Sequence, residues 1–288
     1  MTTLLTIDVG GTRIKSAVWD QEKAILRDKE SVPTPDHLED FYQVITALRE
    51  KHAEVSGVAF SLPGAVDNEK GIIEGVSAVP YIHHFPIKQA LHERTQRPVA
   101  IANDANCAAL GEVFHGAGRG EQQLIFVVIG TGIGGAVVLN GQLIPGVHLL
   151  AGEFGMMLDQ HNRWSSHDGT LVQAAKTYSE QTQTTIDGKG LLEAAVAGDA
   201  LAQSLTASVY DTLAHLLINL QFTFDPARII IGGGASKNPD FIKGIRAAIE
   251  KLADQAGRPP ILPEIVPAKL GNDANLVGAA MYFSQQEN

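Results

Sequence analysis

The sequence predicts an α/β protein built from two related lobes. Apolar runs of strand length alternate with longer stretches of helical periodicity, which is typical of helices packed on mixed sheets. A strand, a glycine-rich turn and a returning strand also occur twice, over residues 4–20 and 124–140. Because internal repetition indicates a duplicated architecture, we expect two lobes around a central cleft. The alternative is that the two hairpins are unrelated, since any α/β protein contains several turns of this kind.

The first repeat continues into alternating helices and strands. The strand that follows the first helix ends at Pro63 and Gly64, and the next strand leads directly into a helix. We place the first lobe at residues 1–115 and expect the C-terminal segment 275–288 to return to it. The expected elements are a helix at 37–54, a strand at 55–62, a strand at 98–102 and a helix at 104–114.

The second repeat is followed by one long buried helix over residues 200–224. Arg228–Ile231 is a strand that ends in three consecutive glycines. Helices are expected at 239–255 and 275–286, and we place the second lobe at 116–274.

Composition narrows the possible classes of protein. The 288 residues suit either one large α/β domain or two lobes, and with 44% apolar and 19% charged residues the chain can bury a core. The net charge of −10 disfavours binding to nucleic acid phosphates. Cys107 is the single cysteine, so it offers no internal disulfide or zinc cluster and indicates a reducing compartment. No signal peptide is recognised, and no apolar run reaches the roughly 18 residues of a membrane span, so we expect a cytoplasmic protein.

The turn of the first hairpin carries Asp8, Gly10, Gly11 and Thr12. Glycines without a Cβ let backbone N–H groups approach an anion, and a threonine hydroxyl adds a donor. Asp8, at the end of the strand, is suited to holding Mg²⁺ beside phosphates, and Lys15 could add a positive charge. We therefore predict phosphate binding at this turn. The alternative is an ordinary hairpin in which Asp8 favours the turn.

Residues 130–135 of the second hairpin include four glycines. Glycine weakens a strand unless something must approach its backbone, so we predict a second phosphate contact here. No Gly-Lys-Ser/Thr follows, and the turn leads into another strand rather than a helix. The segment therefore matches neither a P-loop nor a dinucleotide fingerprint, and a nicotinamide cofactor is disfavoured.

Asn103 and Asp104 stand where a strand ends and a helix begins, which is where ligands bind in open α/β sheets. Phosphoryl transfer to an alcohol needs an acceptor for the hydroxyl proton, and aspartate is the usual one in kinases. Asn103 could hydrogen-bond a sugar hydroxyl. The alternative is that Asp104 simply caps the helix.

Three other segments are candidates for ligand contacts. Glu153 stands between glycines and could accept hydrogen bonds from two neighbouring hydroxyls, or lie in a surface turn. The glycines at 232–234 could lie against adenine or ribose, or merely connect a strand to a helix. Gly64 ends a buried strand and is a candidate to face a sugar.

As a set, these segments resemble the ROK family of bacterial sugar kinases (repressor, open reading frame, kinase). The resemblance covers nearly the whole chain in order, although each segment alone is a weak signal. It implies two duplicated actin-like, ribonuclease H-like lobes that use ATP. The segments that carry it are Asp8–Thr12, Leu62–Gly64, Asn103–Asn106, Ile129–Gly135, Ala151–Gly155 and Ile231–Gly234.

The resemblance also implies roles for single residues. Asp104 would be the catalytic base, and Asp8 would help to place Mg²⁺. Gly64, Asn103, Asp104 and Glu153 would contact the sugar. The residues expected to bind the nucleotide are Gly10, Gly11, Thr12, Gly130, Thr131, Gly132 and Gly233.

The sequence departs from the family pattern around residue 156. Many members have a histidine there, followed by a cysteine-rich zinc motif. This chain has Met156, and residues 157–169 contain His161 and His167 but no cysteine. We therefore expect no zinc site. Members without the zinc motif that carry the Ala-Gly-Glu-Phe-Gly segment include kinases similar to β-glucoside kinases.

The expected activity is transfer of the γ-phosphoryl group of ATP to a hexose or hexoside, with the 6-hydroxyl as acceptor. Glucose, a β-glucoside, N-acetylmannosamine, fructose and allose all remain open as the substrate. Related kinases commonly pair, so we expect a homodimer. One alternative is a non-catalytic sugar-sensing protein of the same fold, although the first strand begins at Leu4 and leaves no place for the winged helix of repressor members. Another is a kinase for acetate or glycerol.

Overall fold

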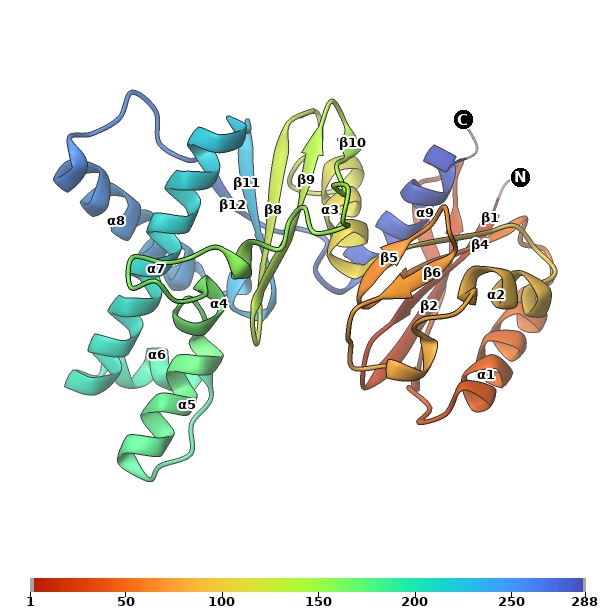
Figure 1. The fold of residues 1–288 in the computed structure, drawn as a ribbon, viewed down its shortest axis with the longest axis horizontal. Helices are drawn as coiled ribbons and strands as arrows, with labels where there is room; N and C mark the ends of the chain where they lie inside the picture. The colour runs from red at the N-terminus through yellow and green to blue at the C-terminus, as the bar shows by residue number, and fades with distance from the viewer. Residues whose placement is uncertain (1–2, 287–288) are drawn as a thin grey trace. The chain divides into compact units, whose positions relative to one another are not determined.

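The computed structural model describes residues 3–286, whose contacts divide into two compact units. The first unit runs to Arg119 and also holds Gly146–Leu150 and the chain from Asn272 onward. The second unit holds Gly120–Pro145 and Ala151–Gly271. Each unit has its own mixed sheet and helices (Figure 1), which confirms the predicted α/β class.

The sheet of the first unit has the strand order β3-β2-β1-β4-β7. The β1–β2 and β2–β3 pairs are antiparallel, whereas β1, β4 and β7 run parallel. A separate hairpin, β5–β6, follows β4. The strands are β1 (Thr3–Val9), β2 (Arg13–Asp20), β3 (Ile25–Pro33), β4 (Gly57–Leu62), β5 (Ala65–Asp67), β6 (Ile72–Glu74) and β7 (Val99–Asn103).

The sheet of the second unit repeats this order as β10-β9-β8-β11-β12. Again the first three strands are joined by antiparallel pairs, and the last three run parallel. The repeated hairpins of the sequence are therefore equivalent elements of two sheets with one topology. The strands are β8 (Leu124–Ile129), β9 (Ile133–Leu139), β10 (Gln142–Leu143), β11 (Arg228–Gly232) and β12 (Ile265–Pro267).

Helices cover both faces of the first sheet, because its central strands β1 and β4 are buried along their whole length. Leu5 and Ile7 belong to a core shared with α1 and α2, whereas Leu4 points the other way, towards α9. α9 packs closely on α3, since a Cβ on Gly278 would lie 1.6 Å from the carbonyl oxygen of Cys107. The helices are α1 (Leu38–Lys51), η1 (Pro80–Ile82), α2 (Ile87–Thr95), α3 (Asp104–His115) and α9 (Ala274–Gln286).

The core of the second unit lies between its sheet and α7, the long helix expected from the sequence. Ile125, Val127 and Ile129 face Leu213 and Leu217 in this core. The helices are α4 (Ser165–Asp168), α5 (Leu171–Thr182), α6 (Gly188–Val196), α7 (Ala200–Phe224) and α8 (Pro239–Ala256), with short 3₁₀ helices η2 (Phe154–Met156) and η3 (Gly234–Lys237). A last one, η4 (Gly271–Asp273), stands where the chain passes between the units.

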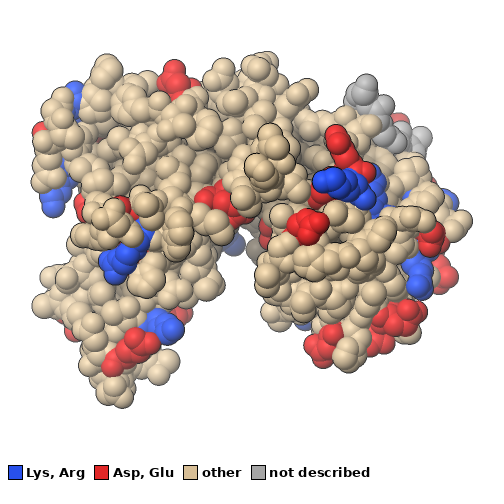
Figure 2. Space-filling model, viewed as in Figure 1, with Lys and Arg blue, Asp and Glu red and all other residues tan. Residues whose placement is uncertain are grey.

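Charged side chains of both signs are visible on one face of the molecule (Figure 2). On the face drawn in Figure 2, lysine and arginine side chains are scattered among acidic ones rather than gathered into a patch. Every helix within residues 3–286 is too short or too polar to cross a membrane.

Candidate active site

Asp8 lies one residue before the end of β1 and is 7% exposed. Its Oδ1 accepts a hydrogen bond of 2.9 Å from Ser61 Oγ on the neighbouring strand β4. Its Oδ2 lies 3.4 Å from Nζ of Lys15, its direct partner across the antiparallel β1–β2 pair. The strand register therefore holds a carboxylate and an ammonium group together directly below the first glycine turn.

Two hydrogen bonds to backbone carbonyl groups hold the first glycine turn in place. The Gly10 N–H donates to the Arg13 carbonyl at 3.0 Å, and Thr34 Oγ1 donates to the Gly10 carbonyl at 2.6 Å. A Cβ on Gly11 would lie 2.6 Å from the Cβ of Ala78, so only glycine fits there. Gly11 and Thr12 are exposed at the tip, where a ligand can reach their backbone.

Asp104 is the first residue of α3, and Asn103 is the cap. The Asn103 Oδ1 accepts a hydrogen bond from the N–H of Asn106 at 3.1 Å, and its Nδ2 donates to the Gly64 carbonyl at 2.9 Å. The interpretation of Asp104 as a mere helix cap is therefore wrong. Its Oδ1 accepts from the N–H of Ala105 at 2.8 Å, and the residue is half-buried.

Gly64 occupies a conformation that favours glycine, with φ at +101°. A Cβ there would lie 2.8 Å from Cε1 of His83 and 2.9 Å from Cγ2 of Ile73. His83 is itself held by Ser77, whose Oγ is 2.6 Å from the ring Nε2. Burial lowers the pKa of His83, which favours its neutral form. Gly64 is thus packed against His83 and Ile73, and its carbonyl accepts a hydrogen bond from Asn103.

Two residues that the sequence did not single out connect Asp8 with Asp104. Asn275, on α9, donates through Nδ2 to Ser61 Oγ at 3.1 Å and to the Asp104 carbonyl at 3.3 Å. Ser61 in turn donates to Asp8. Cys107 lies in the same region, where burial and the charges of both aspartates raise the pKa of its thiol. The first unit therefore brings Asp8, Asp104 and Asn103 to one end of its sheet.

The second glycine hairpin has an open tip and a packed base. The Gly130 N–H donates to the Gly132 carbonyl at 2.9 Å, and a Cβ on Gly130 would meet no atom within 4 Å. A Cβ on Gly135, by contrast, would lie 2.2 Å from the Phe126 carbonyl and 2.6 Å from the Phe154 ring. Gly135 therefore has a packing reason of its own, because it accommodates the ring of Phe154.

The segment from Ala151 to Gly155 is packed on this hairpin. Gly152 has φ at +101°, and a Cβ there would lie 2.4 Å from the Gly135 carbonyl. A Cβ on Gly155 would lie 2.2 Å from the Ile133 carbonyl. Glu153 stands exposed between these anchored positions, so its carboxylate is presented to solvent beside the hairpin.

A cleft of about 520 Å³ opens beside the tip of the second hairpin. Its walls include Gly130, Gly234 and Ala235, together with Leu171 from the start of α5. Gly233 has φ at +90°, and a Cβ on it would lie 2.0 Å from the Ile129 carbonyl. Gly233 therefore packs against the end of β8, and its neighbour Gly234 forms the wall.

The same cleft has two lysines that the sequence did not indicate. Lys189 comes from the first turn of α6, and Lys237 from the end of η3. Neither is part of a recognisable motif, because each reaches the cleft only through the packing of helices on the sheet.

Residues 157–169, at the position of the family's zinc motif, form a small closed loop. Asp159 Oδ1 accepts from the N–H groups of His161 and Arg163 at 2.8 and 2.9 Å, and Arg163 pairs with Asp168. Although burial acts to raise it, these backbone donors hold the pKa of Asp159 below its usual value. Among residues 3–286, no group of three or more His, Cys, Asp or Glu side chains could hold a metal ion. Met156, at the family's histidine position, is 59% exposed.

Comparison with known proteins gives a consistent result. The model of the ROK family matches residues 4–286. A β-glucoside kinase of Klebsiella pneumoniae is 30% identical over 98% of this chain and 96% of its own length. A ROK family protein of Streptococcus pneumoniae, solved in complex with sucrose, is 39% identical with a TM-score of 0.91, covering 99% of both chains. A ROK glucokinase of Streptomyces griseus, solved with glucose and AMPPNP, is 28% identical with a TM-score of 0.80, covering 98% of this chain and 99% of that one.

Proposed function

Because the chain belongs to the ROK family, we propose that it transfers the γ-phosphoryl group of ATP to a hydroxyl of a hexose or hexoside. The kinase relatives support a sugar kinase, and the relative solved with AMPPNP supports the use of ATP. The observation that carries the proposal within this chain is the placement of Asp104. Asp104 follows the end of a parallel strand and is adjacent to Asn103, whose side chain donates a hydrogen bond to the Gly64 carbonyl.

In this proposal Asp104 accepts the proton of the attacking hydroxyl. General-base catalysis of this kind typically contributes about 10²- to 10⁴-fold. Asn103 uses its Oδ1 to cap α3 and one Nδ2 hydrogen to hold Gly64, so its second Nδ2 hydrogen is the one available for a sugar oxygen. Gly64 and the exposed Glu153 are proposed to complete the sugar contacts. The 6-hydroxyl is the proposed acceptor because a primary alcohol is the least hindered hydroxyl of a hexopyranose.

The proposed ATP contacts fall on both hairpins. Gly11, Thr12 and Gly130–Gly132 are exposed at the tips, whereas Gly10 is half-buried. The N–H groups of Gly10 and Gly130 donate to the Arg13 and Gly132 carbonyls, so the phosphate oxygens would be bound by N–H groups of the other tip residues and by the hydroxyls of Thr12 and Thr131. The cleft beside Gly130 has the size expected for a small-molecule site and would take the nucleoside, with Gly233 near it as the residue that precedes the wall residue Gly234. Lys237, in the same cleft, would add a positive charge.

Asp8 is the side chain proposed to hold Mg²⁺. Mg²⁺ is commonly held by one or two carboxylates, with water and phosphate oxygens in the remaining positions. The Oδ2 of Asp8 lies 3.4 Å from Nζ of Lys15, whose side chain is partly exposed and could pair with a phosphate instead. When bound, the ion would neutralise charge on the phosphates.

Asp104→Asn tests the proposal directly. Sugar-dependent release of ADP should fall by about 10²-fold or more, while sugar still binds, because the amide keeps the shape but cannot take the proton. Turnover is measured by a coupled ADP assay and sugar binding by calorimetry.

Asp40→Asn is the matched control, since Asp40 also stands in the first turn of a helix in the same unit. It should leave turnover unchanged. Full turnover in Asp104→Asn would remove Asp104 from its proposed role. A panel of hexoses and β-glucosides with 6-deoxyglucose as the negative control locates the acceptor, and sugar binding without ADP release on the whole panel would favour a sugar-sensing protein instead.

A further inference from the structure

Of the three carboxylates in the proposed site, that of Asp8 belongs to the most buried residue, which is 7% exposed. A buried carboxylate is destabilising unless hydrogen-bond donors compensate for the lost water. Ser61 Oγ is such a donor, 2.9 Å from Oδ1 of Asp8. Ser61 is itself 0% exposed, so its neighbours in the protein decide where its hydroxyl proton points.

Asn275 determines the direction of that proton. Its side-chain amide lies 3.1 Å from Ser61 Oγ and 3.3 Å from the carbonyl oxygen of Asp104. A carbonyl oxygen can only accept a hydrogen bond, so the amide atom that faces both groups must be Nδ2 rather than Oδ1. Ser61 Oγ therefore accepts from Asn275, and its single proton remains for Asp8.

The packing of α9 holds Asn275 in this place. A Cβ on Gly57, the first residue of β4, would lie 2.4 Å from Cζ of Phe283, so α9 contacts β4 closely near its beginning as well as at Ser61. On the side of α3, a Cβ on Gly111 would lie 2.4 Å from the carbonyl oxygen of Ala274. The amide is therefore carried by a helix in close contact with both neighbouring elements, which favours a fixed geometry.

One side chain thus acts on two groups of the proposed site. Through Ser61, Asn275 keeps Oδ1 of Asp8 hydrogen-bonded, which leaves Oδ2 on the side of Lys15. Through its second contact, Asn275 holds the backbone of Asp104 at the start of α3. A carboxylate with one oxygen fixed in this way presents its other oxygen in a defined direction.

We propose that Asn275 and Ser61 are positioning residues of the kinase site. Asn275 directs the Ser61 proton to Asp8 and holds the backbone that carries the proposed base, and neither side chain needs to touch a substrate. This inference rests on the proposed function, in which Asp8 holds Mg²⁺ beside the ATP phosphates. Loss of a group that hydrogen-bonds a metal-ligating carboxylate typically lowers metal affinity or activity by about 10- to 100-fold.

Nucleotide binding tests the positioning without any turnover. Calorimetry of AMPPNP with the full chain, with and without Mg²⁺, measures how far Mg²⁺ tightens binding. Ser61→Ala and Asn275→Leu should each reduce this tightening by about tenfold, while the affinity for AMPPNP alone stays near that of wild type. An equal effect of Mg²⁺ on wild type and on folded variants would overturn the proposal, and so would a wild type on which Mg²⁺ has no effect.

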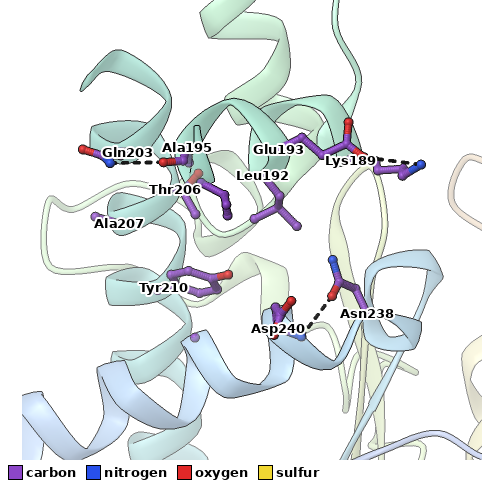
Figure 3. Close-up of a pocket in the computed structure, with 12 residues that line it drawn as sticks. Lys189, Leu192, Glu193, Ala195, Gln203, Thr206, Ala207, Tyr210, Asn238 and Asp240 are labelled. Atoms are coloured by element: carbon purple, nitrogen blue, oxygen red, sulfur yellow. Dashed lines mark hydrogen bonds and ion pairs between the residues drawn. The ribbon is translucent and has the colours of Figure 1, made fainter. Parts of the chain in front are cut away.

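Gln203→Met is the matched control for Asn275→Leu. Gln203 Nε2 also donates to a backbone carbonyl, that of Ala195 at 3.1 Å, and joins α7 to α6 in the second unit (Figure 3). Both substitutions replace a side-chain amide with an apolar group of similar size. The control should leave the effect of Mg²⁺ and the turnover unchanged, and a loss equal to that in Asn275→Leu would refute a specific role for Asn275.

Kinetics distinguishes positioning from a general effect on the fold. In Ser61→Ala, kcat should fall by about tenfold while the KM for the sugar changes by less than about twofold, because Asp8 is not proposed to touch the sugar. In an Asp8→Ala background, the same substitution should lower kcat by less than about twofold further, because Ser61 acts through Asp8. A further tenfold loss in that background would overturn the proposal.

The two measurements also separate this inference from the proposed function. A wild type that releases no ADP with any sugar would reject the kinase activity, and the AMPPNP titration would then decide the positioning role. Normal turnover in wild type and in both folded variants would reject the positioning role alone. Melting temperatures establish that each variant is folded, and Ser61→Ala decides the outcome if Asn275→Leu does not fold.

Discussion

The hairpins β1–β2 and β8–β9 occupy the same place in two sheets of the same strand order, yet they differ in chemistry. One residue before the end of the first strand, the first unit has Asp8 and the second has Val128. Their partners across the hairpin are Lys15 and Gly134. At this position the first hairpin therefore carries an ion pair, and the second has a valine opposite a glycine.

The regions that follow the hairpins also differ. In the first unit, Asn103 and Asp104 end the last parallel strand and begin α3. In the second unit, the glycines after β11 and the helices α5 and α6 surround an open cleft. The two copies of the scaffold therefore differ: carboxylates gather at the end of the first sheet, whereas an open cleft lies beside the hairpin tip in the second unit. Substitutions at equivalent positions of the two hairpins test whether the two units differ in their contribution to activity and stability.

The largest effect is expected from the position that distinguishes the hairpins. Asp8→Asn keeps an oxygen for Ser61 but removes the charge, and should lower kcat/KM by about 10²-fold, the size of a typical loss of one electrostatic contact. Val128→Thr, at the equivalent position, should change it by less than about threefold. Steady-state kinetics with ATP and the preferred sugar give kcat/KM for both variants. Equal losses in the two would mean that both hairpin positions contribute equally to catalysis.

The second hairpin contains glycines of two kinds, and they should respond differently to alanine. Gly135→Ala forces a Cβ against the Phe126 carbonyl and the Phe154 ring, and should lower the free energy of unfolding by about 2–3 kcal/mol. Gly130→Ala faces open space, so stability should change by less than about 1 kcal/mol while the KM for ATP rises. Denaturant unfolding measures the change in stability, and steady-state kinetics measures the KM for ATP. A large loss of stability in Gly130→Ala with an unchanged KM would mean that Gly130 serves packing rather than ATP binding.

The smallest expected effect is a loss of stability on acidification, and the first unit should lose stability before the second as the pH falls. His83 and His115 have pKa values lowered mainly by burial, and both lie in that unit. Since each binds a proton more readily when unfolded, the stability they confer is complete above about pH 6.5 and is lost as the pH falls towards their folded pKa values. The helices and strands of the first unit should therefore exchange amide hydrogens faster at pH 5.5, after correction for intrinsic rates.

His83→Gln provides the check on this pH effect, because glutamine does not titrate but can still hydrogen-bond Ser77. The variant should lose less stability than wild type between pH 7 and pH 5.5. His115 packs edge-on to the Trp19 ring, with centroids 5.1 Å apart, so Trp19 fluorescence reports on the same region. Faster exchange confined to the second unit would contradict the expectation.

Several elements were predictable because their signals are local. The strand at 124–129 and the helix at 200–224 match β8 and α7 at both ends, since each is a continuous apolar pattern with a clear stop. Asp199 caps α7 through the N–H of Ala202, and Asp225 ends it in the left-handed conformation. The strand β3 was not predicted, because its side chains are largely exposed and its sequence lacks an apolar alternation. The short helices α5 and α6 were also missed.

The sequence by itself determined the α/β class, the repeated hairpins and the family, because these depend on hydrophobic periodicity and on glycines at fixed spacing. Only the tertiary structure decided which glycines are open and which are packed, since that depends on atoms contributed from elsewhere, as Phe154 does at Gly135. It also decided that Ser61 and Asn275 connect Asp8 with the start of α3, across 214 residues of chain. A serine and an asparagine carry no such signal in sequence, because their hydrogen bonds form only when strands and helices far apart in the chain pack together.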